Sequence, residues 1–478
     1  MTNFLRVVSS HQDFTKGGSG MSRRILAFAV SASLIVGTTI DTHAASIVVT
    51  NQALPTIVTQ FVPTTLRLDQ LLIVQQSDGA QPSILETPTC NLTESIEAAR
   101  SLLEPIALSI GEKSYRYTER RAGSNVTFRD PEKTIALALM NAETCELSTT
   151  TITKRGDELV AKPGFVIEPV TRSNGIQWNN WATEFRVTEP EHTVVVLLKY
   201  PYKRDQRVAR TVKSVTGKLR TVYDTKSVTV PIYYTPYSRE LHVPELVQGG
   251  ENHLSSLAER AYTDLRERGV TSYAVPGALV AHVEALRPEY VIRLAPIEHM
   301  DLTEFLLDPS WTTERIHVVI GANLEDVARY TCSKASACGL MQFTKGTYGY
   351  MRKLYPAAGL IESFEDGARD QFNAMKAALL LHDHNSSQLV NAFGSDILND
   401  PRLEEYLAAA YNTGVARVIA VVTAAKKKNV PDWADASGTR RGARLLPETK
   451  GYIAKLRFLR DSWQQEPLAQ AEIKTPND

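Results

Sequence analysis

The chain has 478 residues, which is too long for one ordinary hydrophobic core, so we expect two or three domains. Its hydrophobic content of 43% and charged content of 22% are those of an ordinary globular protein. The 53 basic and 53 acidic residues balance, so the net charge of zero gives no support to a nucleic-acid partner or to an anionic membrane, although a local region can still be charged.

Residues 21–45 have the three-part layout of a secretory signal peptide. Two arginines precede an apolar run over residues 25–37, and small residues follow it. The run is shorter than a typical transmembrane span. We therefore expect an exported protein whose signal region is residues 1–45, with translation starting at Met1 or Met21.

Residues 46–243 are rich in valine, threonine, isoleucine and tyrosine, which predicts a β-rich domain. Strands are predicted at residues 193–200, 218–224 and 227–234. A helix is the main exception, at residues 92–110, with Asn91 or Thr93 as its N-cap. The residues indicate no chemistry in this domain, so adhesion, spacing or contact with a protein of the cell envelope are the roles we expect.

An aromatic group in the same domain, Trp178, Trp181 and Phe185, permits two interpretations. The side chains could stack on sugar rings, or they could be core residues, which is the commoner use of aromatics at such spacing.

Four cysteines in an exported chain predict two disulfides. Proximity in sequence pairs Cys332 with Cys338 and leaves Cys90 for Cys145. Buried free thiols are the alternative. Neither pair has the companions of a zinc site, and we expect no metal and no other cofactor.

The pattern becomes helical after a predicted linker at residues 244–252, which contains a proline and two glycines. Helices are predicted at residues 254–268 and 277–286, and a third opens at Pro288 and runs through Ile297. The predicted fold class is therefore α+β multidomain, a β-rich domain followed by a mostly α-helical domain at residues 253–463. A mobile polar tail is predicted at residues 464–478.

The third helix carries the first candidate for chemistry, Glu298. Val291, Leu294 and Ala295 lie seven, four and three residues before it and share its face of the helix. Partial desolvation on that apolar face would raise the pKa of the carboxyl, so that it could donate a proton near neutral pH. The alternative is a glutamate at a helix end that faces solvent.

Three segments in the helical part resemble, in order, motifs of soluble-lytic-transglycosylase-like enzymes, which cleave bacterial peptidoglycan. The segment GLMQF at residues 339–343, preceded by Tyr330 and Ser333, resembles their YS..GA.GLMQF motif. AAYNTGVARV at residues 409–418 and LPETKGY at residues 446–452 resemble the next two. The resemblance covers residues 253–463 and implies a lysozyme-like fold.

The resemblance also implies which residue is the catalytic acid. RLAPIEHMD at residues 293–301 resembles the catalytic LPLVES segment, which makes Glu298 the acid. His299 stands where the family has serine, and Glu298 lies 41 residues before Gly339, farther than is usual. One inserted helix at residues 313–330 would account for the extra length, and it contains the alternative acid, Glu325.

The same resemblance implies that five residues line the substrate cleft: Met341, Gln342, Phe343, Tyr411 and Asn412. Packing in the core is the alternative for the methionine, the phenylalanine and the tyrosine. The amide of Gln342 needs a hydrogen-bond partner, which the N-acetyl group of a sugar could supply.

The implied function is a peptidoglycan lytic transglycosylase, a carbon–oxygen lyase in the periplasm or secreted from a bacterium. One glutamate would cleave the MurNAc–GlcNAc bond and leave 1,6-anhydroMurNAc ends, with glycan strands as the partner and no nucleic acid. One alternative is a lysozyme-like hydrolase, with Asp301 as the second carboxylate. Another is a non-catalytic scaffold that binds the cell wall.

Overall fold

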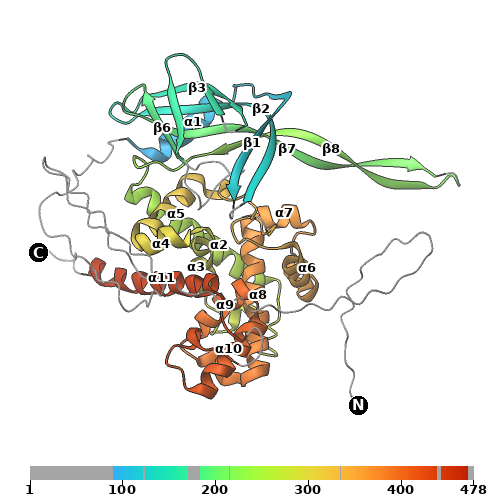
Figure 1. Cartoon of the computed structure of the whole chain (residues 1–478). Helices are drawn as coiled ribbons and strands as arrows, with labels where there is room; N and C mark the ends of the chain where they lie inside the picture. The colour runs from blue at the N-terminus through green and yellow to red at the C-terminus, as the bar shows by residue number, and fades with distance from the viewer. Residues whose placement is uncertain are drawn as a thin grey trace, which may run out of the picture. The chain divides into compact units, whose positions relative to one another are not determined.

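The computed structural model describes residues 90–121, 124–156, 158–170, 184–214, 216–333, 335–438 and 443–471, all within one compact unit, residues 80–478. A β-rich region precedes a mostly helical region, which confirms the predicted α+β architecture (Figure 1). The predicted signal region lies outside the described residues, as do Trp178 and Trp181. Phe185 is buried, as expected of a core residue.

The β-rich region contains an antiparallel sheet of six strands in which β2 and β7 are central. The sheet order is β4-β3-β2-β7-β8, and β1 also pairs with β2. Its strands are β1 (Ile110–Arg121), β2 (Ser124–Asn141), β3 (Leu147–Arg155), β4 (Glu158–Ala161), β7 (Thr193–Lys213) and β8 (Leu219–Tyr234). A separate pair is formed by β5 (Val166–Val170) and β6 (Glu184–Glu189).

The core of this region lies where β2 passes between β3 and β7. Residues 135–140 of β2 are all buried, so both faces of the strand are covered. Helix α1 (Leu92–Leu103) contributes Leu92, Ala99 and Leu103, which are buried on one side of the helix. The side chain of Asn91 accepts a hydrogen bond from the backbone N–H of Glu94, which confirms the predicted cap.

The predicted strands are present but longer than expected. The strand predicted at residues 193–200 is the first part of β7, which continues to Lys213. The strands predicted at residues 218–224 and 227–234 are one strand, β8. The predicted helix at residues 92–110 stops at Leu103, because a turn at Glu104 and Pro105 ends it and residues 106–109 lead into β1.

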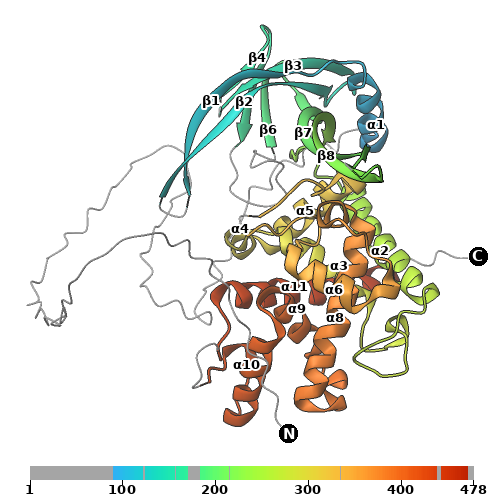
Figure 2. The same cartoon turned by 90° about the vertical axis from the view of Figure 1, so that its right-hand side faces the viewer.

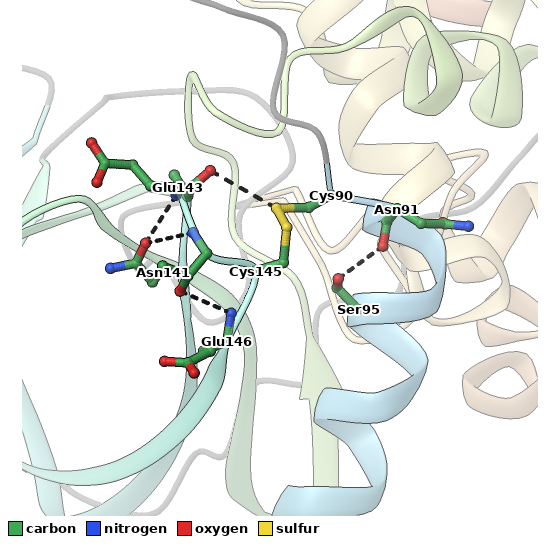
Figure 3. Close-up of a disulfide and its surroundings, with 9 residues drawn as sticks. Cys90, Asn91, Ser95, Asn141, Glu143, Cys145 and Glu146 are labelled. Carbon is green, nitrogen blue, oxygen red and sulfur yellow. Dashed lines mark hydrogen bonds between the residues drawn. A yellow bond between two sulfur atoms is a disulfide. The ribbon is translucent and has the colours of Figure 1, made fainter.

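Two disulfides join the cysteines in the predicted pairs. Cys90 bonds to Cys145 and ties the start of α1 to the turn between β2 and β3 (Figure 3). Cys332 bonds to Cys338 across a short hairpin. The pairs indicate an oxidising compartment. Within the residues that the structure describes, we find no helix with the length and apolar character needed to cross a membrane.

The helical region is a set of packed helices seen from two sides in Figures 1 and 2. Its α-helices are α2 (Pro244–Glu267), α3 (Pro288–His299), α4 (Leu302–Leu307), α5 (Pro309–Asn323), α6 (Lys345–Leu354), α7 (Phe364–Arg369), α8 (Gln371–Phe393), α9 (Leu403–Thr413), α10 (Val415–Lys428) and α11 (Pro447–Ala471). Because α11 continues to Ala471, the first part of the predicted mobile tail is helical.

The predicted linker at residues 244–252 is wrong, because these residues form the first turns of α2. The glycines there serve close packing between helices. A Cβ atom on Gly250 would lie 2.1 Å from the carbonyl oxygen of His317, and one on Gly321 would lie 2.1 Å from that of Leu246. Glycines at these positions therefore let the backbones of α2 and α5 touch.

Two predicted helices also differ from the structure. In residues 277–286 only a 3-10 turn forms, Val280–His282, because the chain runs antiparallel to Thr271 at Leu279. The helix predicted at residues 313–330 ends early: its first part belongs to α5, a short 3-10 helix follows at Leu324–Asp326, and residues 327–330 are not helical. Asp308 caps the start of α5, and Leu324, with a φ of 46°, ends it.

Candidate active site

Glu298 lies in the last turn of α3, and its apolar face is buried as the sequence predicts. Val291, Leu294 and Ala295 are fully buried, whereas Glu298 is half-buried. Its carboxyl group faces a cavity of about 220 Å³ that is also lined by α9 and α11. Asn412, Glu448, Tyr452 and Lys455 are the polar residues that share this cavity with Glu298.

The carboxyl group of Glu298 has a strongly perturbed proton affinity. Burial raises its pKa from 4.5 to about 7 because the charged form loses hydration. The Tyr452 hydroxyl donates a hydrogen bond to Oε1 of Glu298 over 2.8 Å, and this bond lowers the pKa in part. The charge of Lys455 lowers it too, and the charge of Glu448 raises it. Near neutral pH both forms of the carboxyl are therefore populated.

Lys455 is a buried cation that supports the end of α3. Its Nζ donates a hydrogen bond to the backbone oxygen of Met300 over 2.6 Å, just beyond the last residue of α3. Burial lowers the pKa of Lys455, and the Glu298 charge opposes that effect. The ammonium therefore both holds the backbone beside Glu298 and favours the ionised carboxylate.

His299 joins α3 to the segment GLMQF. Its Nε2 donates a hydrogen bond to the backbone oxygen of Leu340 over 2.8 Å, and the ring is buried. Burial lowers the pKa of His299 to about 4, so the ring is neutral near pH 7. The residue that replaces the serine of the resembling family thus has a structural role here.

The turn at Gly339 fixes the path of GLMQF. Gly339 has a φ of 77°, and a Cβ atom there would lie 1.8 Å from the backbone oxygen of Ala368. Only glycine meets both requirements, because it has no Cβ atom and tolerates a positive φ. The Cys332–Cys338 hairpin precedes this turn, and the backbone of Cys338 pairs with that of Phe343.

Of the residues predicted to line the cleft, two have fully buried side chains, and two others form hydrogen bonds to backbone oxygens of the GLMQF segment. The side chains of Met341 and Phe343 are 0% and 2% exposed, which fits the alternative of core packing. Gln342 is half-buried, and its amide donates a hydrogen bond to the backbone oxygen of Gly339 over 2.7 Å. The Tyr411 hydroxyl donates a hydrogen bond to the backbone oxygen of Met341 over 2.6 Å.

Tyr411 and Asn412 connect this segment to the cavity at the end of α9. Burial raises the pKa of Tyr411 well above its usual value, and the nearby charge of Glu298 adds to the effect. Asn412 lines the cavity, and its side-chain oxygen accepts a hydrogen bond from the Thr449 hydroxyl over 2.8 Å. The motifs around residues 298, 341, 411 and 452 therefore meet at one place.

The alternative acid, Glu325, has a different environment. It lies in the 3-10 helix Leu324–Asp326, its side chain is exposed, and it is not among the residues that line the cavity. Glu325 therefore has neither the burial nor the cavity that Glu298 has. The geometry thus favours Glu298 for proton transfer.

Sequence reasoning did not select Tyr452 or Lys455 for the site. Tyr452 belongs to the LPETKGY segment, so the resemblance contained a signal for it. No sequence signal pointed to Lys455, which lies three residues after Tyr452, because a lysine in an amphipathic helix is normally solvated. Its role follows from the packing of α11 against α3.

Two other polar groups have structural roles. Asp301 caps α4, since its Oδ1 accepts hydrogen bonds from the backbone N–H groups of Thr303 and Glu304. Asp383, within the sequence HDH, accepts a hydrogen bond from the Tyr355 hydroxyl over 2.7 Å and another from the backbone N–H of Tyr273.

Comparisons of the chain with protein-family models, with curated proteins and with solved structures found no match.

Proposed function

We propose that the chain is a lytic transglycosylase that cleaves the MurNAc–GlcNAc bond of peptidoglycan with Glu298 as its single acid and base. The observation that carries this proposal is the carboxyl of Glu298, whose pKa is about 7 at the wall of a cavity. Two of the three segments that resemble the family line the same cavity, through Asn412 and through Glu448 and Tyr452, and the third is hydrogen-bonded to Tyr411. Exported peptidoglycan enzymes work in an oxidising compartment, with which the two disulfides agree.

The proposed reaction has two proton transfers. The protonated carboxyl of Glu298 gives its proton to the bridging oxygen, the bond from C1 of MurNAc to that oxygen breaks, and GlcNAc leaves with a free 4-hydroxyl. The carboxylate then takes the proton of the C6 hydroxyl of MurNAc, whose oxygen forms a bond to C1. The product is a 1,6-anhydro ring, no water is consumed, and Glu298 is protonated again.

A pKa near ambient pH suits a group that must act in both steps. Burial alone would hold the carboxyl protonated, and the hydrogen bond from Tyr452 and the charge of Lys455 both favour the carboxylate. These opposing effects let Glu298 lose its proton to the leaving group and then regain one from the sugar hydroxyl.

A lysozyme-like hydrolase is the second candidate, and the position of Glu448 favours it. Glu448 lines the same cavity as Glu298, so two carboxyl groups face the space in which a sugar would bind. A second carboxylate can activate water or attack C1. Asp301, the second carboxylate expected from the sequence, uses one oxygen as a helix cap.

Mass spectrometry of the fragments released from purified peptidoglycan sacculi distinguishes these activities. We expect fragments with anhydro ends, which are lighter than reducing ends by one water. Reducing ends would support hydrolysis and contradict the lyase. No release by the folded, disulfide-bonded chain would leave the third possibility, a scaffold that binds the wall without cleaving it.

Glu298→Gln and Glu325→Gln are the matched variants for the identity of the acid. Glutamine retains the shape of glutamate and cannot donate the proton, so we expect Glu298→Gln to lower turnover by about a thousandfold or more. Glu325→Gln removes an exposed carboxyl and should leave turnover unchanged. Loss of turnover in Glu325→Gln alone would refute the assignment.

A further inference from the structure

The outer halves of β7 and β8 form a two-stranded ribbon. β7 pairs with β2 over residues 193–199, whereas its pairing with β8 continues to Lys213. Beyond Tyr202, β8 is the ladder partner of β7 within the described strands, and Figure 1 shows the two strands continuing together past the rest of the sheet. About eleven residues of β7 extend the ribbon by about 35 Å.

The base of this ribbon is attached and its outer part is exposed. Near the base, Arg204 forms an ion pair with Asp366 of α7 over 2.5 Å. Farther out, residues 219–227 of β8 are exposed apart from Val222. The outer ribbon therefore has little core of its own. Two-stranded hairpins without such a core are only marginally stable. The exposed outer ribbon is therefore a candidate surface for contact with a partner.

The outer ribbon concentrates positive charge in a chain whose net charge is zero. Residues 206–226 contain six basic residues and one acidic residue, so the segment carries +5. The acidic residue, Asp224, already forms an ion pair with Arg210. Lys213, Lys218 and Arg220 are exposed and cluster around the turn of the hairpin.

Large apolar side chains are exposed beside these cations. Leu219 is 72% exposed and Tyr223 is 63% exposed. Leu219 pairs with Lys213 and Tyr223 pairs with Ala209, so both apolar side chains and a lysine lie on one face of the ribbon. A leucine and a tyrosine that are exposed on the same face as a cation are a candidate contact surface.

We propose that the tip of the β7–β8 ribbon docks on the anionic surface of a lipid bilayer. Phosphate headgroups complement the charge of Lys213, Lys218 and Arg220. The leucine and the tyrosine enter the boundary between headgroups and acyl chains, where apolar and aromatic side chains are stabilised. A soluble anionic polymer would satisfy the cations alone, which is why the exposed apolar pair favours a bilayer. The proposal is independent of the activity of Glu298.

Co-sedimentation of the full chain with vesicles tests this docking. We expect binding to vesicles that mix phosphatidylglycerol with phosphatidylcholine, weaker binding at high salt, and none to pure phosphatidylcholine. Each cation near an anionic surface contributes about fivefold in affinity, so replacing Lys213, Lys218 and Arg220 with glutamine should weaken binding about a hundredfold. Equal binding to pure phosphatidylcholine, or no binding to either vesicle, would overturn the proposal.

Two further variants separate a bilayer from other anions. Replacing Lys426, Lys427 and Lys428 of α10 with glutamine removes three exposed charges elsewhere and should leave vesicle binding unchanged. Leu219→Ser with Tyr223→Ser retains every cation and should weaken vesicle binding at least tenfold. If that double variant binds vesicles as the parent does, or if the parent prefers soluble polyphosphate to the vesicles, the surface serves an anionic polymer and the bilayer assignment fails.

Discussion

The raised pKa of Glu298 makes a prediction about stability that does not depend on any substrate. An acid whose pKa is higher in the folded chain than in the unfolded chain destabilises the folded state as pH rises. Between pH 4.5 and about 7, the unfolded chain has lost the proton of Glu298 while the folded chain retains it. The folded state binds more protons in that window, so the free energy of unfolding falls as pH rises through it.

The size of the effect follows from the two pKa values. One pKa unit corresponds to about 1.4 kcal/mol, so a pKa that rises from 4.5 to about 7 costs the folded chain about 3 kcal/mol at pH 8. The cost is about 2 kcal/mol at pH 6 and close to zero at pH 4. Glu298→Gln removes the ionisation, and its amide oxygen can still accept the hydrogen bond from Tyr452.

The assay is urea unfolding of the parent and of Glu298→Gln, followed by circular dichroism at pH 4, 6 and 8 with the disulfides intact. We expect the variant to gain about 3 kcal/mol of stability relative to the parent between pH 4 and pH 8. Glu325→Gln, at an exposed site outside the cavity, is the control for exchanging a carboxyl for an amide, and its difference is subtracted from that of Glu298→Gln at each pH. A pH-independent difference for Glu298→Gln would refute the reasoning that burial raises this pKa.

Three further substitutions test the packing around the site. Tyr452→Phe removes a charge-assisted hydrogen bond that lowers the pKa of Glu298. The alkaline limb of the turnover–pH profile should therefore move up by about one to two pH units. An unchanged limb would contradict the role of the phenol. Gly250→Ala should lower the free energy of unfolding in urea by about 2 kcal/mol, because its Cβ atom would clash with the backbone of α5. Gly249→Ala is the control: the nearest contact of its Cβ atom is 3.8 Å away, so it should be neutral or slightly stabilising. Equal effects of the two substitutions would count against the close helix contact. Replacing Cys90 and Cys145 with alanine opens a loop of sequence separation 55 and should cost about 4 kcal/mol in the same assay, and a stability equal to the parent would exclude that crosslink.

Local patterns in the sequence were sufficient for several elements. The N-cap at Asn91 and the helix that opens at Pro288 depend on residues close in sequence, and the structure has both of them. The linker prediction failed at Gly249 and Gly250 because glycine breaks an isolated helix but also permits helices to touch. Only the position of α5 decides between these outcomes.

The candidate site shows the same division. The apolar face of α3 beneath Glu298 is a property of the sequence, because residues three, four and seven apart share a side of a helix. Lys455 and Tyr452 are more than 150 residues from Glu298 in the chain. The hydrogen bond and the charge that lower its pKa against the effect of burial required the folded packing of α11 against α3.

The sequence by itself determined the order of a β-rich and a helical region, the two cysteine pairs, and an acid on an apolar helix face. These features depend on composition, spacing and short-range periodicity. Only the tertiary structure decided that Glu298 is half-buried beside a cavity while Glu325 is exposed, and that β7 and β8 continue as one exposed ribbon. Burial and long-range strand pairing are set by contacts between distant parts of the chain, which no local pattern encodes.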